Sequence, residues 1–507
     1  MKSTLKSISV LLLALTLSTS CSKLDINVNP VNPVTSPSNL RLPAILGNMA
    51  YHNYSHARFS SFHSFYITTR LNNSRIESQL DYSGITRLGA WRWHYFDVGS
   101  NCRGLIETAE REGSFNYLGV AKIMLAYSYL TATDSFGDMP YSEAYGASFN
   151  PVYDRQEQVY DGIEQLLDEG LADLAKANSA TDRVMNATSD LLYQGDLQKW
   201  AAFAKAVKSR MYLHTANFDN GYDRLITTVN DALTNFDGAI YKYPIGAERE
   251  WETNLWGPRV ASPEFNFADI RNNLVESVHT DFLMNFLTIN QANSEYDPRL
   301  FKLTTPGANN RYLSAKSSEG LSTLGLPTGT TLADFANLYN GTWTRNDSPS
   351  PYILKEELYF IKAEAAFYKG DLPTAHAAYK LGIETNLNTV GVAQNDITAY
   401  MASNRVIADP LALKISDIMM QKYVALYLQS ESWVDMRRYG YSTTAYPGIY
   451  YPRNALAEWQ GRFIQRLPYD RQTEYIYNPQ EIARLGADAR NWVFNPVWWA
   501  EQSQLKN

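Results

Sequence analysis

Three histidines near the start of the chain form the closest local set of metal-ligating side chains. His56 and His63 follow His52 by four and eleven residues, and a helix would carry all three on one face. Imidazole nitrogens are common zinc ligands. Aromatic residues such as Tyr51 and Phe62 fill the same stretch. We therefore favour histidines packed among rings and predict no bound metal and no cofactor.

Motifs for covalent chemistry are missing from the sequence. It contains no phosphate-cradling glycine loop, no Gly-x-Ser-x-Gly elbow and no His-Glu-x-x-His pair. Glycoside hydrolysis needs only two suitably spaced carboxylates, and 52 acidic residues supply many candidate pairs. We predict that the protein is not an enzyme, with a surface glycan hydrolase as an alternative.

Several aromatic residues outside clear helical patterns are candidates for ligand stacking. Sugars present flat apolar faces ringed by hydroxyls, so a binder needs exposed rings with polar groups nearby. We predict ligand contacts at Trp251 and Trp343, with Tyr66 and Arg70 as secondary candidates. Trp256 is a further candidate, and a packing role is an equal alternative for it.

The overall composition is that of a large globular protein. Of the 507 residues, 45% are apolar and 19% are charged, which excludes a disordered chain. The formal net charge of −7 argues against nucleic-acid binding. Aromatic residues make up 13% of the chain, more than a core alone requires, so some rings are expected to face a ligand.

The first residues have the order of an export signal. A basic start at Lys2 and Lys6 precedes an apolar run over residues 8–17, and small residues then lead to Cys21. We predict cleavage before Cys21 and lipidation of its thiol. An ordinary cleaved signal with an incidental cysteine is the alternative, because Ser18 stands where a lipobox usually has leucine. With Cys21 lipidated, Cys102 is expected to be a buried small hydrophobe.

Composition and periodicity divide the remaining chain into a tether, a helical scaffold and irregular segments. Prolines and asparagines mark the tether, and mixed proline, glycine and isolated aromatic residues mark the irregular parts. The expected parts are a signal peptide (1–20), a lipid tether (21–43) and a binding domain (44–507), with a helical scaffold over about 44–236 and 351–440, an irregular lobe over about 237–350 and an irregular C-terminal segment (441–507).

Within the scaffold, residues 354–382 have the pattern of a helical pair. Apolar residues recur at the spacing of one helix face from Leu354 to Tyr368. Gly370 is expected to end that helix and Asp371 to cap the next one. The small residues of the second helix permit close approach, as in tetratricopeptide repeats. Weaker pairs are expected over 199–233 and over 117–143 followed by 160–177.

Two groups of charged residues are expected to serve structure. Asp134 and Asp138 flank Gly137 in a tight connection, where carboxylates commonly cap and brace a turn. Asp435, Arg437 and Arg438 are expected to form an ion-pair cluster that fixes helix ends.

Short motifs in a fixed order resemble the SusD/RagB family of surface lipoproteins. The resemblance covers nearly the whole chain, and it rests on residues 24–30 (LDINVNP), 133–143 (TDSFGDMPYSE), 200–214, 297–300 (DPRL), 363–370, 421–423 (QKY), 433–440 (WVDMRRYG), 466–468 (RLP) and 495–499 (NPVWW). Trp91, Trp93 and Tyr95 resemble core positions of the family, and we do not count them as ligand residues.

The resemblance implies a mainly α fold, with a tetratricopeptide-like helical-repeat scaffold and a large irregular lobe. It also implies a lipid-anchored position on the outer membrane, facing the cell exterior, and a SusC-like TonB-dependent transporter as partner. The expected function is capture of an oligosaccharide or polysaccharide and its delivery to that transporter. A peptide ligand is the alternative within the family, and a pure tetratricopeptide interaction protein is the alternative outside it.

Overall fold

The computed structural model shows a mainly helical protein. It describes residues 36–69, 76, 79–85, 88–146, 148–243, 253–257, 277–289, 295–319, 326 and 329–505. Two of the expected ligand residues, Arg70 and Trp251, lie outside the described residues, as do Cys21 and most of the tether.

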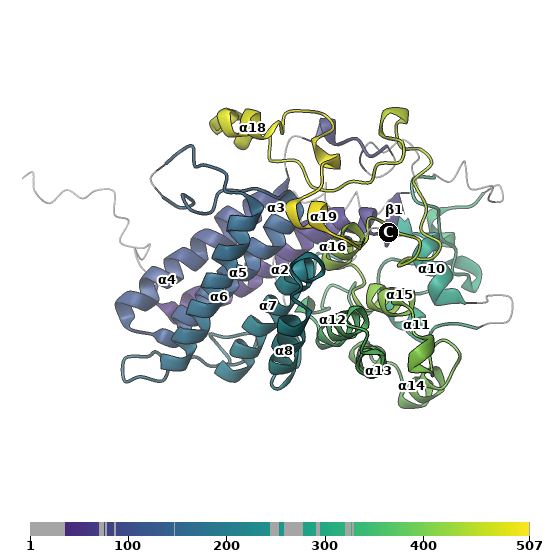
Figure 1. The fold of residues 1–507 in the computed structure, drawn as a ribbon, viewed down its shortest axis with the longest axis horizontal. Helices are drawn as coiled ribbons and strands as arrows, with labels where there is room; N and C mark the ends of the chain where they lie inside the picture. The colour runs from purple at the N-terminus through teal and green to yellow at the C-terminus, as the bar shows by residue number, and fades with distance from the viewer. Residues whose placement is uncertain are drawn as a thin grey trace, which may run out of the picture. The chain divides into compact units, whose positions relative to one another are not determined.

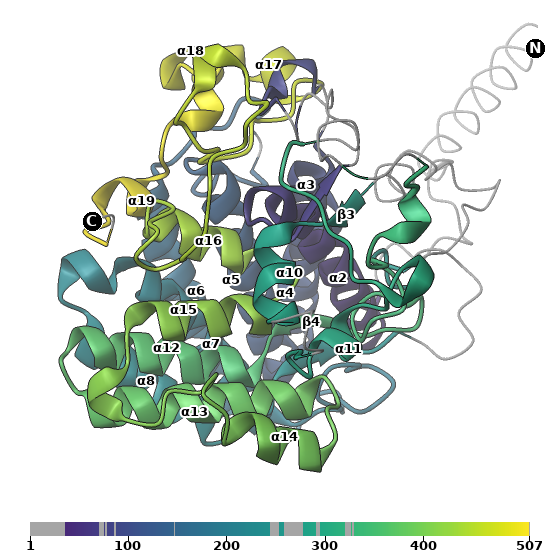
Figure 2. The same cartoon turned by 90° about the vertical axis from the view of Figure 1, so that its right-hand side faces the viewer.

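The helices form one body from Ser38 onward (Figures 1 and 2). The longer ones are α2 (Ser38–His63), α4 (Ser100–Glu112), α5 (Phe115–Phe136), α6 (Gln156–Lys176), α7 (Leu197–Asp219), α8 (Tyr222–Leu233), α12 (Lys355–Tyr368), α13 (Leu372–Thr389) and α15 (Ile415–Ala425). The shorter ones are α3 (Gly89–Arg92), a π-helical turn η2 (Trp93–Gly99), α10 (Asp281–Thr288), α11 (Leu300–Leu303), α14 (Gln394–Met401), α16 (Glu431–Arg438), α17 (Glu474–Tyr477), α18 (Pro479–Leu485) and α19 (Trp498–Gln502).

Strands are few among the described residues. Strand β1 (Ile67–Thr69) pairs with β3 (Ser277–His279), and β2 (Ala239–Tyr241) pairs with β4 (Ser350–Ile353), both antiparallel. The first ladder joins the middle of the irregular lobe to the segment that follows α2, and the second joins the two ends of the lobe to each other.

Consecutive helices pack as pairs, which confirms the expected helical-repeat scaffold. The pairs are α5 with α6, α7 with α8 and α12 with α13. Gly370 has the positive φ of 78° that a helix-ending glycine adopts. The Asp371 side chain then accepts a hydrogen bond of 3.2 Å from the Thr374 backbone N–H, as the sequence predicts for a helix cap.

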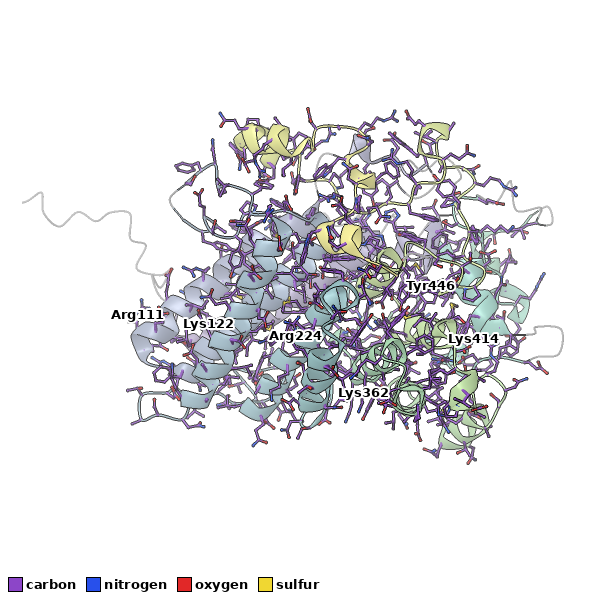
Figure 3. The ribbon with its side chains drawn as sticks, in the orientation of Figure 1. Arg111, Lys122, Arg224, Lys362, Lys414 and Tyr446 are labelled. Atoms are coloured by element: carbon purple, nitrogen blue, oxygen red, sulfur yellow. The ribbon has the colours of Figure 1, made fainter. Side chains whose placement is uncertain are left out.

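Helix α5 lies at the centre of the first half. Every residue from Asn116 to Phe136 except Lys122 is buried, and the helix ends at Phe136, directly before Gly137. A Cβ atom at Gly119 would lie 2.7 Å from the backbone oxygen of Gly170 on α6, so glycine is required for this close approach. Lys122 pairs with Asp173 of α6 at 2.8 Å (Figure 3).

The start of the body differs from the expected boundary. The tether was expected to extend to residue 43, but helix α2 begins at Ser38 and contains Pro43. Pro43 is the sixth residue of this helix and has no N–H to donate, so α2 contains it at the cost of one backbone hydrogen bond. Cys102 is buried, as expected. In the part of the chain that the structure describes, no helix is both long and apolar enough to cross a membrane.

A buried ion network joins the helical pairs to one another. Arg210 of α7 binds Glu357 of α12 through two hydrogen bonds of 2.7 Å, and its Nε lies 3.3 Å from a carboxylate oxygen of Glu431 on α16. The other oxygen of Glu431 lies 2.8 Å from His214 Nε2. Although burial raises the pKa of Glu431, the neighbouring charges of His214 and Arg210 lower it to about 2.

The charged residues of α16 also form buried ion pairs, as the sequence predicts, with the exception of Arg437. Asp435 binds Arg438 and Lys422, each at 2.7 Å, and Arg438 also binds Glu364 of α12. Arg437 takes a different role from the one expected. Its guanidinium donates to the backbone oxygens of Asp134 and Gln465. It also lies over the indole ring of Trp433.

Candidate functional site

An open groove with aromatic walls lies beside the C-terminal segment. Its volume is about 870 Å³, and we call it the aromatic groove. Three parts of the chain form it: the α3–η2 segment, the connection over residues 140–151, and residues 470–478 that include α17. The principal lining residues are Trp91, Arg92, Tyr95, Phe96, Tyr145, Phe149, Glu474 and Tyr477.

Three rings of this groove face solvent. The exposed fractions are 65% for Phe96, 94% for Phe149 and 65% for Tyr477. Large aromatic side chains are rarely left this exposed without a use. Since the three come from separate segments, their position on one groove is a product of the tertiary fold.

The floor of the groove is held by hydrogen bonds between those segments. Trp91 donates its indole N–H to Glu474 at 2.9 Å, and Tyr153 donates its hydroxyl to the other oxygen of the same carboxylate. Tyr95 donates to the backbone oxygen of Pro140 at 2.7 Å. Burial raises the pKa of Glu474. The walls are therefore fixed before any ligand arrives, which lowers the entropic cost of binding.

The 140–151 connection is braced from the residues that follow it. Backbone N–H groups of Tyr141 and Ser142 each donate to Asp154 at 2.9 Å. Asp138 accepts from the backbone N–H of Gln156 at the start of α6, which confirms its expected bracing role. These contacts hold the segment that carries Phe149.

Polar groups accompany the rings. The Arg92 guanidinium lies 5.4 Å from the centre of the Phe96 ring and 3.3 Å from a carboxylate oxygen of Asp97. Gln472, Thr473 and Asn478 add hydrogen-bonding side chains to the lining. The groove therefore combines flat apolar faces with donors and acceptors, an arrangement suited to a ligand with apolar faces and polar edges.

Trp343 and Trp256 lie together, but inside the protein. They are 5% and 7% exposed, and they line a cavity of about 40 Å³. The Asn254 side chain fixes the segment by donating to the backbone oxygens of Trp343 and Ser348. A cavity of this size holds water and is too small for a sugar ring, so in this structure both indoles pack.

Tyr66 also has a packing role. It is fully buried and stacks on Tyr423 with ring centres 4.5 Å apart. Its hydroxyl lies 2.6 Å from the backbone oxygen of Tyr423 and 2.9 Å from that of Leu426. The ring therefore offers no face to a ligand. It lies directly before β1, and local sequence could not distinguish this buried position from an exposed one.

The histidines of α2 do not converge on one point. The rings of His52 and His56 are neighbours, with centres 4.6 Å apart, whereas His63 Nε2 bonds the Tyr82 hydroxyl at 2.6 Å. Burial lowers the pKa of His52 and of His63 to about 3. Neutral rings packed among aromatic residues match the interpretation favoured from sequence.

One other group brings metal-ligating atoms together within the described residues. Atoms of Asp134, His214 and Glu431 lie within 4.8 Å of one another. Asp134 already accepts hydrogen bonds from Tyr160 at 2.5 Å and from Trp499 at 2.8 Å. Because protein donors occupy these atoms, we assign the group to the buried ion network.

Sequence reasoning missed the rings of the aromatic groove. Phe149 lies in a polar connection between Ser148 and Asn150, and a large apolar residue in such a segment is the one local sign of exposure. Trp91 and Tyr95 were set aside as core residues. Trp91 is indeed buried, yet both line the groove.

Comparisons with known proteins agree with the fold. The SusD-like family model described as "Starch-binding associating with outer membrane" matches residues 30–469. The chain therefore belongs to the SusD-like family. A search of curated proteins found no match.

Solved structures show the same fold at low sequence identity. A chitin-binding protein is 20% identical, with a TM-score of 0.70 and coverage of 91% of this chain and 99% of its own. A chitin-binding SusD homolog from Flavobacterium johnsoniae is 18% identical, with a TM-score of 0.69 and coverage of 91% and 98%. A SusD/RagB family protein from Bacteroides thetaiotaomicron is 20% identical, with a TM-score of 0.68 and coverage of 92% and 99%.

Proposed function

We propose that this protein is a lipid-anchored surface protein that captures a glycan in the aromatic groove and delivers it to a SusC-like TonB-dependent transporter. The exposure of Phe96, Phe149 and Tyr477 on one open groove carries the proposal. The family description and the names of two similar structures support a carbohydrate as the ligand.

The groove explains how such a ligand would be held. The C–H face of a pyranose stacks on an aromatic ring, and its hydroxyls bond nearby polar side chains. Phe149 and Tyr477 supply rings from two separate segments, and Arg92 supplies a donor. Arg70 and Trp251 remain proposed as further ligand contacts beyond the described residues.

Removing two exposed rings is expected to weaken glycan binding. Because neither ring contributes much to the core, Phe149→Ala with Tyr477→Ala is expected to leave the melting temperature nearly unchanged. Affinity is expected to fall by about 1–3 kcal/mol, the usual cost of truncating an aromatic contact. Calorimetric titration with chitohexaose and maltoheptaose measures the change. Leu411→Ala, an exposed apolar residue outside the groove, is the matched control.

Three outcomes would decide against parts of this proposal. Unchanged affinity in the double variant would exclude the aromatic groove as the site. Absence of binding to any polysaccharide in a panel, with binding to peptides, would favour a peptide ligand. Release of shorter sugars by the purified protein would favour a hydrolase.

The anchor is tested at Cys21. Replacement by alanine removes the thiol that would receive the lipid, so Cys21→Ala is expected to move the protein from the membrane fraction to the soluble fraction. Cell fractionation measures this, with Cys102→Ala as the control because that thiol is buried. Intact-mass spectrometry that finds an unmodified Cys21 in native protein would contradict lipidation.

The transporter partner is tested by purification. Extraction of the native protein in mild detergent is expected to recover a large β-barrel protein with it. Repeated recovery of the lipoprotein by itself would favour a free-standing binding protein.

A further inference from the structure

A second groove lies between α11 and α14, and we call it the α11–α14 groove. Its volume is about 680 Å³. Among the described residues, four aromatic side chains are more than half exposed, and three of them line the aromatic groove. The fourth is Phe301, 55% exposed, and it lines the α11–α14 groove. In the part of the chain that the structure describes, aromatic side chains that are more than half exposed are thus confined to the two open grooves.

Phe301 belongs to a cluster of rings. Its centre lies 5.6 Å from that of Tyr296 and 6.2 Å from that of Tyr312, and both pairs meet edge to face. Such contacts fix ring orientation. The exposed part of the Phe301 ring therefore has a defined position and orientation.

The rim of this groove carries hydrogen-bonding groups of both charges. Glu295 and Asp396 are exposed and Lys302 is partly exposed, and none of the ion pairs found among the described residues uses them. These groups can therefore bond a ligand without first breaking a contact inside the protein. Arg405 also lines the groove, lies 4.8 Å from the Phe286 ring and has a buried Nε without a partner.

The floor of this groove is rigid and one edge is strained. Tyr400 lies on the floor, and its hydroxyl is 3.2 Å from a guanidinium nitrogen of Arg299, which is bound in turn to Asp297 within the core. Ile289 lines one edge with a φ of 44°. A β-branched residue adopts that conformation rarely, and such strain clusters at ligand sites.

We propose that the α11–α14 groove is a second carbohydrate-binding site, with Phe301 as its stacking residue and Asp396 as a hydroxyl acceptor. The proposal rests on the proposed function, because it takes the ligand class from there. Figure 2 shows α14 at the bottom of the body and α17 at the top, with α11 between them and nearer to α14. A single ligand that occupies both grooves must therefore be a long polysaccharide.

Two separated sites favour a polymer over its fragments. Once one groove holds a long chain, binding of the other groove becomes intramolecular, and overall affinity rises by about 10²–10⁴ when the spacing fits. A short oligosaccharide gains nothing from the second site except an additional binding event. The second groove would thus retain polysaccharides at the surface.

The test compares variants of each groove with the same two sugar types. Parent protein is expected to bind two molecules of chitohexaose or of maltoheptaose in calorimetry. Phe301→Ala with Asp396→Asn should reduce this to one and should weaken binding of the matching polymer, colloidal chitin or soluble starch, by about tenfold or more. Phe149→Ala with Tyr477→Ala should also leave one bound oligosaccharide and weaken binding of the polymer. Leu411→Ala should change neither the number of bound oligosaccharides nor the affinity for the polymer.

Each outcome decides one proposal. One bound oligosaccharide that is lost only in the aromatic-groove variant overturns the second site and leaves the proposed function intact. One bound oligosaccharide that is lost only in the α11–α14 variant supports the second site and removes the first. Absence of binding to both oligosaccharides and both polymers overturns the two together. Phe301→Ser repeats the test with a different side chain. Its circular dichroism spectrum should be unaltered, which shows that a loss of binding does not come from unfolding.

Discussion

Replacement of Arg210 by methionine is expected to lower the free energy of unfolding by about 3–5 kcal/mol. Arg210 is buried and neutralises the two buried carboxylates of Glu357 and Glu431 on different helices. Removal of the cation leaves the Glu357 carboxylate without its ion pair and the Glu431 carboxylate with only its contact to His214, in a medium that solvates charge poorly. This cost exceeds the loss of the hydrogen bonds alone. Urea-induced unfolding monitored by circular dichroism measures the change.

An exposed pair supplies the control. The Arg155 side chain is 69% exposed, and its guanidinium lies 3.3 Å from a carboxylate oxygen of Glu157. Surface pairs of this kind contribute about 0–1 kcal/mol, so Arg155→Met should have little effect. Equal effects of the two substitutions would mean that the buried network does not hold the helical pairs together. A second variant, Arg210→Met with Glu357→Leu and Glu431→Leu, should recover much of the loss because the two carboxylates that Arg210 neutralised are removed with it.

Mild acid is expected to destabilise the protein strongly. Burial lowers the pKa of His52 and His63 to about 3 and that of His279 to about 4, and it also lowers the pKa of His56 and His94. Each imidazole has a pKa near 6.5 in the unfolded chain. Below pH 6.5 the unfolded chain therefore binds more protons than the folded one. The free energy of unfolding falls by about 1.4 kcal/mol per histidine for each pH unit.

Over the same pH range, protonation of some buried carboxyl groups raises the free energy of unfolding and protonation of others lowers it. Burial raises the pKa of Asp134 and Glu357. Because these groups bind protons more tightly in the folded protein, they contribute an increase in the free energy of unfolding as the pH falls. The depressed pKa of Glu431 adds to the loss at lower pH. With five neutral histidines, we expect a net decrease in the denaturation midpoint from pH 7 to pH 5.

A single substitution isolates one histidine. His279 Nε2 bonds the Tyr427 hydroxyl at 2.6 Å, and glutamine can keep a hydrogen bond there but does not titrate. His279→Gln is expected to lower stability at pH 7 yet to reduce the slope of stability against pH by about one proton. A parent protein whose midpoint is constant from pH 7 to pH 5 would show that these rings titrate normally.

Much of the scaffold could be predicted from the sequence because its signals are local. The apolar spacing from Leu354 to Tyr368, the glycine at 370 and the cap at Asp371 all act within one or two helical turns. The stretch from Asn116 to Thr131 is apolar nearly all round and likewise predicts a helix that is buried on most faces. Only the ends of elements were misplaced, as at Ser38, where prolines suggested an extended chain.

The candidate groove could not be predicted in the same way. Whether a ring stacks on a ligand depends on which segments cover it, and those segments are far apart in the sequence. Trp343 and Trp256 stand in irregular sequence like exposed residues, but Asn254 and the surrounding rings enclose them. Phe149 is uncovered because nothing in the described structure packs over its connection.

The composition of the aromatic groove has a consequence for synthesis of the protein. Its walls come from residues 91–96, 140–151 and 470–478, so the last wall is made only when more than nine tenths of the chain has been translated. A product that ends before Asp470 would still contain all three helical pairs but only part of the groove. Under the proposed function, ligand binding would therefore report that translation had passed residue 478, and a shorter product would retain the helical pairs without the complete groove.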